Sequence, residues 1–505
     1  MSANDSSSVD RQKQATLILP EESFTVAPRP DWSEPEKWVW QEICAGRIAD
    51  FNQRYGALDP KTPDGWSETR EITPSFLETI LTRDPYQKAL ARQGVRILGA
   101  WVRQPVDLEN GSLSHQWWLE GSRIEADTNL RWLESTSAIS FEKSVFIGTL
   151  KLSAAKVGGQ LTMSGATFTG ALDMNGLEVG SSLFDSEGAT FKDVDLRSAK
   201  VGGQFSMIGA TCTGRLDMGG LEVGSSLLMR EGAIFKQEVL LTFAAIGGNL
   251  DVSGSHFTLL DLTETSIRNE LFLGAGADTK PLWQPGSRLV LRNTVVSSIQ
   301  APHDLDAFPN DFDLAGCTYT RLGGLSAAGE GTQMASYEPE WFVKWLEKDK
   351  NYSPQPYQQL ASVLRTMGHP DKANTILYKG KERERSEEKG RGHRSKWLGL
   401  SILKWTMGYG YGYRYFRSLA WVILFTSIGA LVVYTTGIGK GWSLPKMLGF
   451  SFDLLLPLVK LDESHYKLLS EKISGWQYYY FYVHKLVGYI LASFVAAGLS
   501  GITKK

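Results

Sequence analysis

Residues able to carry out chemistry are few in this sequence and show no catalytic spacing. The seven histidines lack metal-ligand spacing, and the three cysteines, Cys44, Cys212 and Cys317, are far apart and odd in number. This argues against a zinc site and against a disulfide framework. No Walker-type loop, H-E-x-x-H or G-x-S-x-G motif is present, and "GYGYGY" at 408–413 lacks the strand-to-helix context of a dinucleotide-binding loop. We therefore expect no catalytic residue, no cofactor and no metal.

Two acidic residues recur at equivalent places. Asp173 and Asp217 both lie in the tripeptide "LDM", between apolar residues. In a strand, alternate side chains point to opposite faces, so these carboxylates are expected on a solvated face. Catalysis by paired carboxylates would need a cleft, and the repeat offers none.

A basic stretch, residues 383–417, precedes a long apolar segment. The whole chain has a net charge of −2, which excludes a protein that binds polyanions over its whole surface. Because the stretch is next to a membrane-span candidate, contact with anionic lipid headgroups is favoured over nucleic acid. The candidate lipid-headgroup contacts are Arg391, Arg394, Lys396, Lys404, Arg414 and Arg417.

A short apolar segment, residues 447–459, is interrupted by Ser451 and Asp453 and closed by Lys446 and Lys460. Its 13 residues are too few to cross a bilayer as a helix. An interfacial helix is the favoured interpretation, and a re-entrant or pore element is the alternative. The candidate pore residues are Ser451, Asp453 and Pro457, and Asp453 is the one to test.

Two transmembrane helices are expected to flank that segment. Residues 418–439 contain no charge over 22 positions, and a second apolar stretch covers residues 478–502. The basic residues before the first span place the preceding domains in the cytoplasm under the positive-inside tendency. His484 and Lys485, which interrupt the second stretch, are expected to reach the outer interface. The predicted localisation is the bacterial inner membrane, with two spans and both termini cytoplasmic.

Most of the remaining chain is a repeat. Apolar pairs such as Leu161/Met163 and Leu172/Met174 fall on an 11-residue lattice, with glycine corners on alternate steps. Residues 155–192 match residues 199–236 at 28 of 38 positions, so two 22-residue coils form a 44-residue duplicated unit. Strands of this kind bury their apolar face only by stacking. The predicted fold is mainly β: a right-handed parallel β-solenoid with two strand-and-corner halves per coil.

The repeat has flanking segments of different character. The predicted organisation is a disordered tail (1–30), a helical cap (31–92), the β-solenoid (93–330), a helical hairpin (334–390), a basic juxtamembrane segment (391–417), transmembrane helix 1 (418–439), an interfacial or re-entrant segment (447–459) and transmembrane helix 2 (478–502).

Several motifs in fixed order carry a family resemblance. They are "GVRILGAWVRQPVDLEN" (94–110), the coils, "YSPQPYQQLASVLRTMGHPDKA" (352–373), "GYGYRYFRSLAWVILF" (410–425) and "FSFDLLLPLV" (450–459). Together they resemble a bacterial family of membrane-associated proteins with pentapeptide-like repeats, some of which are labelled membrane-associated oxidoreductases. The resemblance implies a cytoplasmic β-solenoid tethered by two C-terminal spans, and it carries over no catalytic residue.

Two functions follow from this reading. The first is a non-enzymatic, membrane-tethered scaffold or sensor whose solenoid binds a protein or ligand. The second is an oligomeric membrane pore or ion-channel-like effector gated by the solenoid. Expected partners are membrane lipids and either another protein or further copies of the chain.

Overall fold

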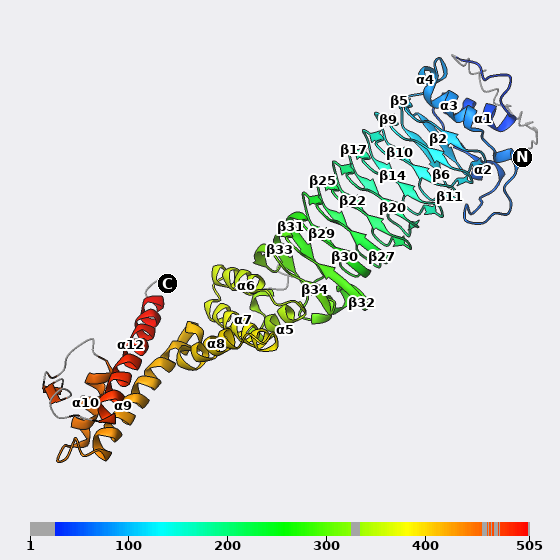
Figure 1. The fold of residues 1–505 in the computed structure, drawn as a ribbon. Helices are drawn as coiled ribbons and strands as arrows, with labels where there is room; N and C mark the ends of the chain where they lie inside the picture. Colours follow the sequence, from blue (N-terminus) through cyan, green and yellow to red (C-terminus); the bar gives the residue numbers. More distant parts are fainter. Residues whose placement is uncertain are drawn as a thin grey trace, which may run out of the picture. The chain divides into compact units, whose positions relative to one another are not determined.

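The computed structural model describes residues 26–324, 334–456, 462, 464–465, 467–468, 473 and 475–502. The chain divides into two compact units, Met1–Gln237 and Glu238–Lys505. Both contain coils of a parallel β-solenoid, which has about 10 turns and about 22 residues per coil, followed by C-terminal helices (Figure 1). This confirms the predicted solenoid and its coil length. Most of the predicted tail, and the end of the predicted solenoid at 325–330, lie outside the described residues.

Short helices occupy the start of the first unit. They are α1 (Glu34–Cys44), α2 (Phe51–Tyr55), the 3-10 helix η1 (Glu68–Arg70), α3 (Pro74–Thr82) and α4 (Tyr86–Ala89). Aromatic rings of this region pack edge to face, with centroids 4.9 Å apart for Trp32 and Phe76. Helix α3 contacts β4 (Val106–Asp107) and β5 (Ser112–Leu113), so it covers the first coil.

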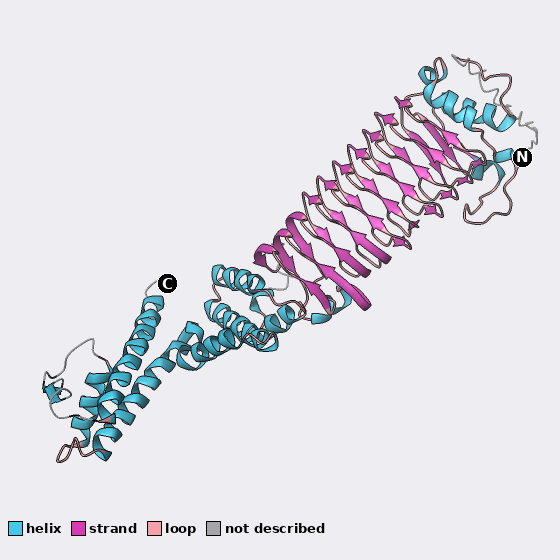
Figure 2. Cartoon of the chain, viewed as in Figure 1, coloured by secondary structure: helices cyan, strands magenta, loops and turns pink. Residues whose placement is uncertain are grey.

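Most coils of the first unit contain four two-residue strands, whereas β2 (Val95–Leu98) and β6 (Trp117–Glu120) have four residues each. In one coil the four strands are β13 (Lys156–Val157), β14 (Leu161–Thr162), β15 (Thr167–Phe168) and β16 (Leu172–Asp173). Their first residues are five or six positions apart, and Figure 2 shows the short strands recurring along the coils. The prediction of two strands per coil was therefore wrong. Val157 and Phe168, which lie between the apolar pairs of the 11-residue lattice, belong to additional strands, β13 and β15.

The remaining strands follow the same plan, and most of those in the second unit are longer. In chain order they are β1 (Ala49–Asp50), β2 (Val95–Leu98), β3 (Trp101–Val102), β6 (Trp117–Glu120), β7 (Arg123–Ile124), β8 (Thr128–Asn129), β9 (Glu134–Ser135), β10 (Ile139–Ser140), β11 (Val145–Phe146), β12 (Leu150–Lys151), β17 (Glu178–Val179), β18 (Leu183–Phe184), β19 (Thr190–Phe191), β20 (Val194–Asp195), β21 (Lys200–Val201), β22 (Phe205–Ser206), β23 (Thr211–Cys212), β24 (Leu216–Asp217), β25 (Glu222–Val223), β26 (Leu227–Leu228), β27 (Ile234–Leu240), β28 (Ala245–Ile246), β29 (Leu250–Asp251), β30 (His256–Asp261), β31 (Ser266–Phe272), β32 (Leu282–Val290), β33 (Val295–Gln300), β34 (Asp311–Asp313) and β35 (Thr318–Leu322).

The interior of the coils is filled by stacked identical or similar side chains. Phe146, Phe168 and Phe191 form one such stack, with ring centroids 5.0 and 5.4 Å apart and planes 9° from parallel.

One interior position does not hold an apolar side chain. Asp185 occupies the coil position held by Met163 in the preceding coil and Met207 in the following one, and its side chain is 1% exposed.

An exposed column of charges runs along one edge of the same coils. Parallel pairing places Glu134, Lys156, Glu178, Lys200 and Glu222 in one line, one per coil. The signs alternate strictly, and two of the neighbouring pairs have N···O distances of 3.4 and 3.2 Å. Opposite charges on directly paired residues stabilise a sheet, each by a small amount.

The glycines at one corner permit close stacking of the backbone. A Cβ atom placed on Gly202 would lie 2.5 Å from the carbonyl oxygen of Gly180, and one on Gly224 would lie 2.1 Å from that of Gly202. Both distances are far below van der Waals contact. The repeated corner glycines are therefore required by the separation between coils.

In the second unit, three helices follow the last coil. They are α5 (Pro339–Glu347), α6 (Pro354–Thr366) and α7 (Pro370–Gly390). Helix α6 contacts β35, and α7 packs on α5 and α6. Two glutamine side chains of α6 bond to the backbone near β35: Gln355 donates to the carbonyl of Cys317 at 2.9 Å and Gln359 to that of Tyr319 at 2.5 Å. Since an uncovered strand edge invites pairing with other chains, α6 protects this end of the sheet.

The chain ends in a set of longer helices. These are α8 (Arg394–Met407), the 3-10 turns η5 (Gly408–Gly410) and η6 (Gly412–Phe416), α9 (Arg417–Thr435), α10 (Leu444–Leu455) and α12 (Trp476–Ile502). Helices α9, α10 and α12 contact one another in all three pairings. Among the described residues, one stretch, Gly412–Thr435, is long and apolar enough to cross a membrane.

Candidate functional site

A cluster of polar side chains lies buried between α9, α10 and α12. Helix α10 contributes Ser451 and Asp453, both of which are 0% exposed. The Oδ2 atom of Asp453 is 3.0 Å from Nδ1 of His465, and the backbone N–H of Asp462 donates to the same oxygen at 3.4 Å. A carboxyl group and an imidazole are thus paired among apolar helices.

A second imidazole reaches the same part of α10 from α12. Nε2 of His484 lies 3.2 Å from the backbone carbonyl oxygen of Ser451 and 3.4 Å from its hydroxyl. Nδ1 of the same ring lies 3.3 Å from the hydroxyl of Tyr480. If Nε2–H donates to the carbonyl, a neutral His484 has a free lone pair on Nδ1 for the Tyr480 hydroxyl. The side chain of His484 is 2% exposed and lies inside the bundle, and its expected position at the outer interface stays a prediction.

Small residues allow the three helices to approach this cluster closely. A Cβ atom on Gly429 of α9 would lie 2.1 Å from Oγ of Ser451 and 3.0 Å from Cε1 of His484. A Cβ atom on Gly488 of α12 would lie 1.5 Å from the carbonyl oxygen of Leu455. Small residues at helix contacts are typical of packing inside membranes, where close backbone approach drives association.

Aromatic rings enclose the Asp453–His465 pair. Phe450 of α10 packs edge to face on His465 at 5.2 Å and on Phe481 of α12 at 5.7 Å. Ionisable groups in such surroundings are costly unless paired, and they commonly mark ion or proton pathways. The arrangement places a carboxyl group within hydrogen-bond distance of one imidazole, and a second imidazole, that of His484 on α12, contacts the same helix α10 at Ser451.

The sequence-predicted pore residues are only partly brought together. Ser451 and Asp453 lie in this cluster, whereas Pro457 is outside the described residues. The helix around them, α10, covers residues 444–455 of the predicted 447–459 segment. Their histidine partners were missed because they are 12 and 33 positions away in sequence, and neither spacing is a recognised ligand pattern.

The predicted headgroup contacts have different environments. Arg391, Arg394, Lys396 and Arg417 are exposed. Lys404 instead pairs with Glu382 at 2.6 Å, and the guanidinium of Arg414 lies 4.3 Å from the ring centroid of Tyr378. The first four are exposed to an external anion, although Lys396 lies 4.0 Å from Glu388 and Arg417 donates to the carbonyl oxygen of Lys404 at 3.2 Å. The other two hold α8 and η6 against α7.

Helix α8 has an apolar surface that the prediction of a basic segment overlooked. None of its residues is buried, and its exposed apolar side chains are Leu398, Ile402, Leu403 and Trp405. The apolar residues within "WLGLSILKW" (397–405) were the available signal. A helix with exposed apolar and basic side chains suits the surface of a membrane.

The fold and this cluster define a β-solenoid protein with a C-terminal helical bundle that encloses a carboxyl–imidazole pair. No family model, no curated protein and no solved structure matches the chain. Within the described residues, no group of three or more histidine, cysteine, aspartate or glutamate side chains is placed to hold a metal ion.

Proposed function

We propose that this protein is a non-enzymatic, membrane-anchored β-solenoid that acts as a scaffold or sensor. Its solenoid binds a ligand or a partner protein, and the C-terminal helices fix it to the bacterial inner membrane. Membrane lipids are the first partner, and another protein or further copies of the chain the second.

The observation that carries the proposal is the distribution of exposed apolar side chains. Of the 28 large hydrophobic side chains exposed in the described residues, 21 lie between Leu398 and Ile490. A soluble surface rarely concentrates apolar side chains in this way. On α9 they include Leu419, Ile423, Leu424 and Leu431, which face away from the bundle.

The double variant Ile423→Asp/Leu431→Asp is expected to lose membrane attachment. These side chains are 62% and 59% exposed, and an aspartate at the centre of a span disfavours insertion by about 3 kcal/mol. Full-length protein is measured in membrane pellets after washing with high salt and with alkaline carbonate. Wild type should stay in the pellet, and the double variant should be lost from it.

Phe243→Asp is the matched control, because Phe243 is 65% exposed on the solenoid. This variant should stay with the membrane. Release of the wild-type protein by salt or carbonate alone would reject anchoring by a span.

Two spans with both termini in the cytoplasm belong to the same proposal. By length alone, the 27 residues of α12 are enough to cross about 30 Å of hydrocarbon, whereas Gly412–Thr435 is the described stretch that is also apolar enough. The exposed basic residues Arg391, Arg394 and Lys396 precede the first span and lie at or just before the start of α8, which favours a cytoplasmic solenoid. The resemblance to membrane-associated pentapeptide-like-repeat proteins supports this topology. Strands that recur every five or six residues are compatible with a pentapeptide-like repeat.

The three cysteine thiols are poor nucleophiles, which supports a non-enzymatic role. Burial raises the pKa of Cys44, Cys212 and Cys317 to about 12. At neutral pH the thiolate needed for nucleophilic chemistry is then scarce.

A second candidate, an oligomeric proton or cation pathway, is favoured by the buried Asp453–His465 pair and by His484 beside it. Two spans from one chain cannot surround a pore, so this function requires several copies. Native mass measurement in detergent would give the number of copies.

Asp453→Asn is expected to reduce flux at least about tenfold if the cluster conducts, since the amide cannot exchange a proton with His465. The measurement is dye-reported proton flux, with parallel cation conductance, in liposomes containing the full chain. Asp278→Asn, an exposed site in a solenoid loop, should leave the flux unchanged. An ordered oligomer without any flux would remove this candidate.

A further inference from the structure

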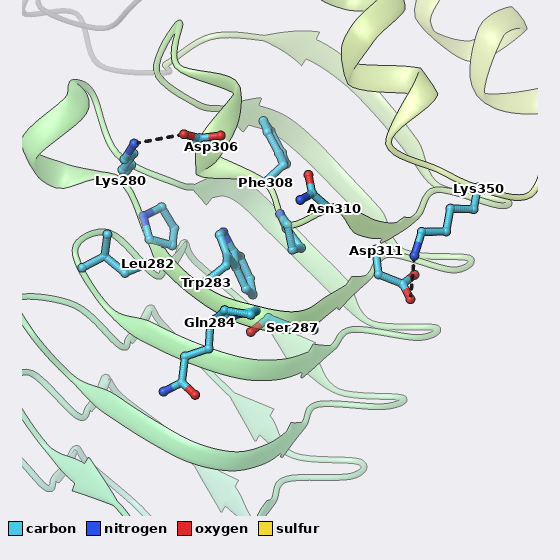
Figure 3. A pocket seen from close by; sticks show the side chains of 14 residues that line it. Lys280, Leu282, Trp283, Gln284, Ser287, Asp306, Phe308, Asn310, Asp311 and Lys350 are labelled. Carbon is cyan, nitrogen blue, oxygen red and sulfur yellow. Dashed lines mark ion pairs between the residues drawn. The ribbon is translucent and has the colours of Figure 1, made fainter.

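A pocket in the second unit lies beside an irregularity in the solenoid. Strand β30 pairs with β32 in parallel, but the register shifts, so that Phe257 faces Trp283 while Leu259 faces Arg288. The additional residues of β32 bulge outward around Pro285 and Gly286. Gly286 has a φ of 86°, a conformation that a proline–glycine turn readily adopts. The bulge forms one wall of a cavity of about 600 Å³ (Figure 3).

The floor of this pocket is apolar and rigid. Trp283 and Phe308 line it together with Pro281 and Pro309. The indole Nε1 of Trp283 donates to the carbonyl oxygen of Ala307 at 2.9 Å, which fixes the plane of the ring. A fixed aromatic ring offers a flat surface to the C–H face of a ligand without a further loss of side-chain entropy.

The residues that line the pocket carry equal numbers of positive and negative charges, and further charges lie just outside it: Lys280 also pairs with Asp304, and Asp311 lies 3.5 Å from Arg288. Lys280 lies 4.0 Å from Asp306 at one end of the labelled side chains, and Lys350 lies 3.7 Å from Asp311 at the other (Figure 3). These are the four charged residues that line the pocket, two of each sign. Such a site favours neither a phosphate ester nor a cation. Since an ion pair stands at each end, it suits a compact ligand better than an extended peptide.

The polar groups of the pocket can both donate and accept hydrogen bonds. The Gln284 side chain is exposed at the bulge, and Asn310 lies above the indole in Figure 3. Oδ1 of Asn310 accepts from Lys348 at 3.2 Å, which leaves its N–H groups for a ligand. Amides and carboxylates in this arrangement match adjacent hydroxyl groups, each of which also donates and accepts.

We propose that this pocket binds a neutral saccharide, a pyranose or a short oligosaccharide, whose C–H face packs on Trp283. Its hydroxyl groups bond to Gln284, Asn310 and Asp311. The pocket volume lies within the range typical of small-molecule sites, about 300–1,000 Å³. The inference deepens the proposed sensor function and rests on it, because it names the class of ligand that the solenoid detects.

The test is saturation-transfer NMR on the full-length chain in a detergent without a sugar headgroup. The probes are glucose, galactose, mannose, N-acetylglucosamine, maltose and cellobiose at millimolar concentrations. At least one should receive saturation at its ring C–H protons. Trp283→Leu should weaken its binding about tenfold and Gln284→Ala about threefold. Gln237→Ala, an exposed glutamine on β27, should have no effect.

Three results would overturn the assignment. One is that no probe binds, and another is that Trp283→Leu and Gln284→Ala bind as wild type does. The third is that glucose 6-phosphate or a proline-rich peptide binds through Trp283 while every neutral sugar fails. Because Gln284 is exposed, its variant keeps the test decisive if Trp283→Leu fails to fold. Carbonate extraction of the same protein separates failure of this site from failure of membrane anchoring.

Discussion

Asp185→Met is expected to stabilise the solenoid by several kcal/mol at pH 8 and to abolish most of its pH dependence. In the folded protein, burial raises the pKa of the Asp185 carboxyl to about 8. Its Oδ1 atom has no hydrogen-bond partner among the described residues. Methionine fills the same position in the neighbouring coils and at Met229 in the duplicated unit. The variant therefore restores an apolar column that the aspartate interrupts.

The direction of the pH effect follows from the two protonation states. Between about pH 4 and pH 8 the folded chain keeps the Asp185 proton, while the unfolded chain has lost it. The free energy of unfolding therefore decreases as the pH rises through this window, and the decrease ends above pH 8. Asp185→Asn should remove this slope, although it leaves a buried amide.

The measurement is the midpoint of the solenoid's thermal transition by circular dichroism from pH 5 to pH 9. Glu187→Gln is the matched control, since it removes an exposed carboxylate two positions away and should leave the slope intact. Equal midpoints for wild type and Asp185→Met at every pH would contradict the prediction.

Gly202→Ala is expected to destabilise the solenoid by about 3 kcal/mol. The new Cβ atom would meet the carbonyl oxygen of Gly180, a backbone atom that no side-chain rotation can move away. Since Gly224 lies on the next coil in the same column, any widening would also alter the following contact.

The same unfolding measurement checks this variant. Gly276→Ala is the control, because a Cβ atom there has no neighbour within 4 Å. A midpoint for Gly202→Ala equal to that of wild type would show that the coils are not in backbone contact at this corner.

The solenoid was predictable because the apolar pattern that specifies each coil lies within a short segment and recurs along the chain. The 11-residue lattice places Leu161, Met163, Leu172 and Met174 in the interior, where all four are buried. The number of strands per coil was not predictable in the same way. Phe168 is an equally good residue for a corner or a strand, and its pairing with Phe146 in the preceding coil makes it part of a strand.

The candidate site was less predictable, since it depends on contacts between distant segments. Ser451 and Asp453 could be found as polar residues within an apolar run. His465 and His484 could not be assigned to them, because helix packing alone brings the imidazoles to α10. Lys404 and Arg394 are both basic residues before the first span, so the sequence does not distinguish them. In the structure, Lys404 pairs with Glu382, whereas Arg394 is exposed.

In the charge column from Glu134 to Glu222, coils that carry glutamate alternate with coils that carry lysine, so the repeat consists of two kinds of coil. A coil that carries glutamate there fits only between coils that carry lysine, so neighbouring coils are not interchangeable. A slip by one coil during folding would place two like charges next to each other where the slip occurs, whereas a slip by two coils would keep the alternation. A duplication that adds 44 residues to the chain keeps the alternation of glutamate and lysine, whereas one that adds 22 residues interrupts it. The size of the duplicated unit is then the smallest that copies the alternation unchanged.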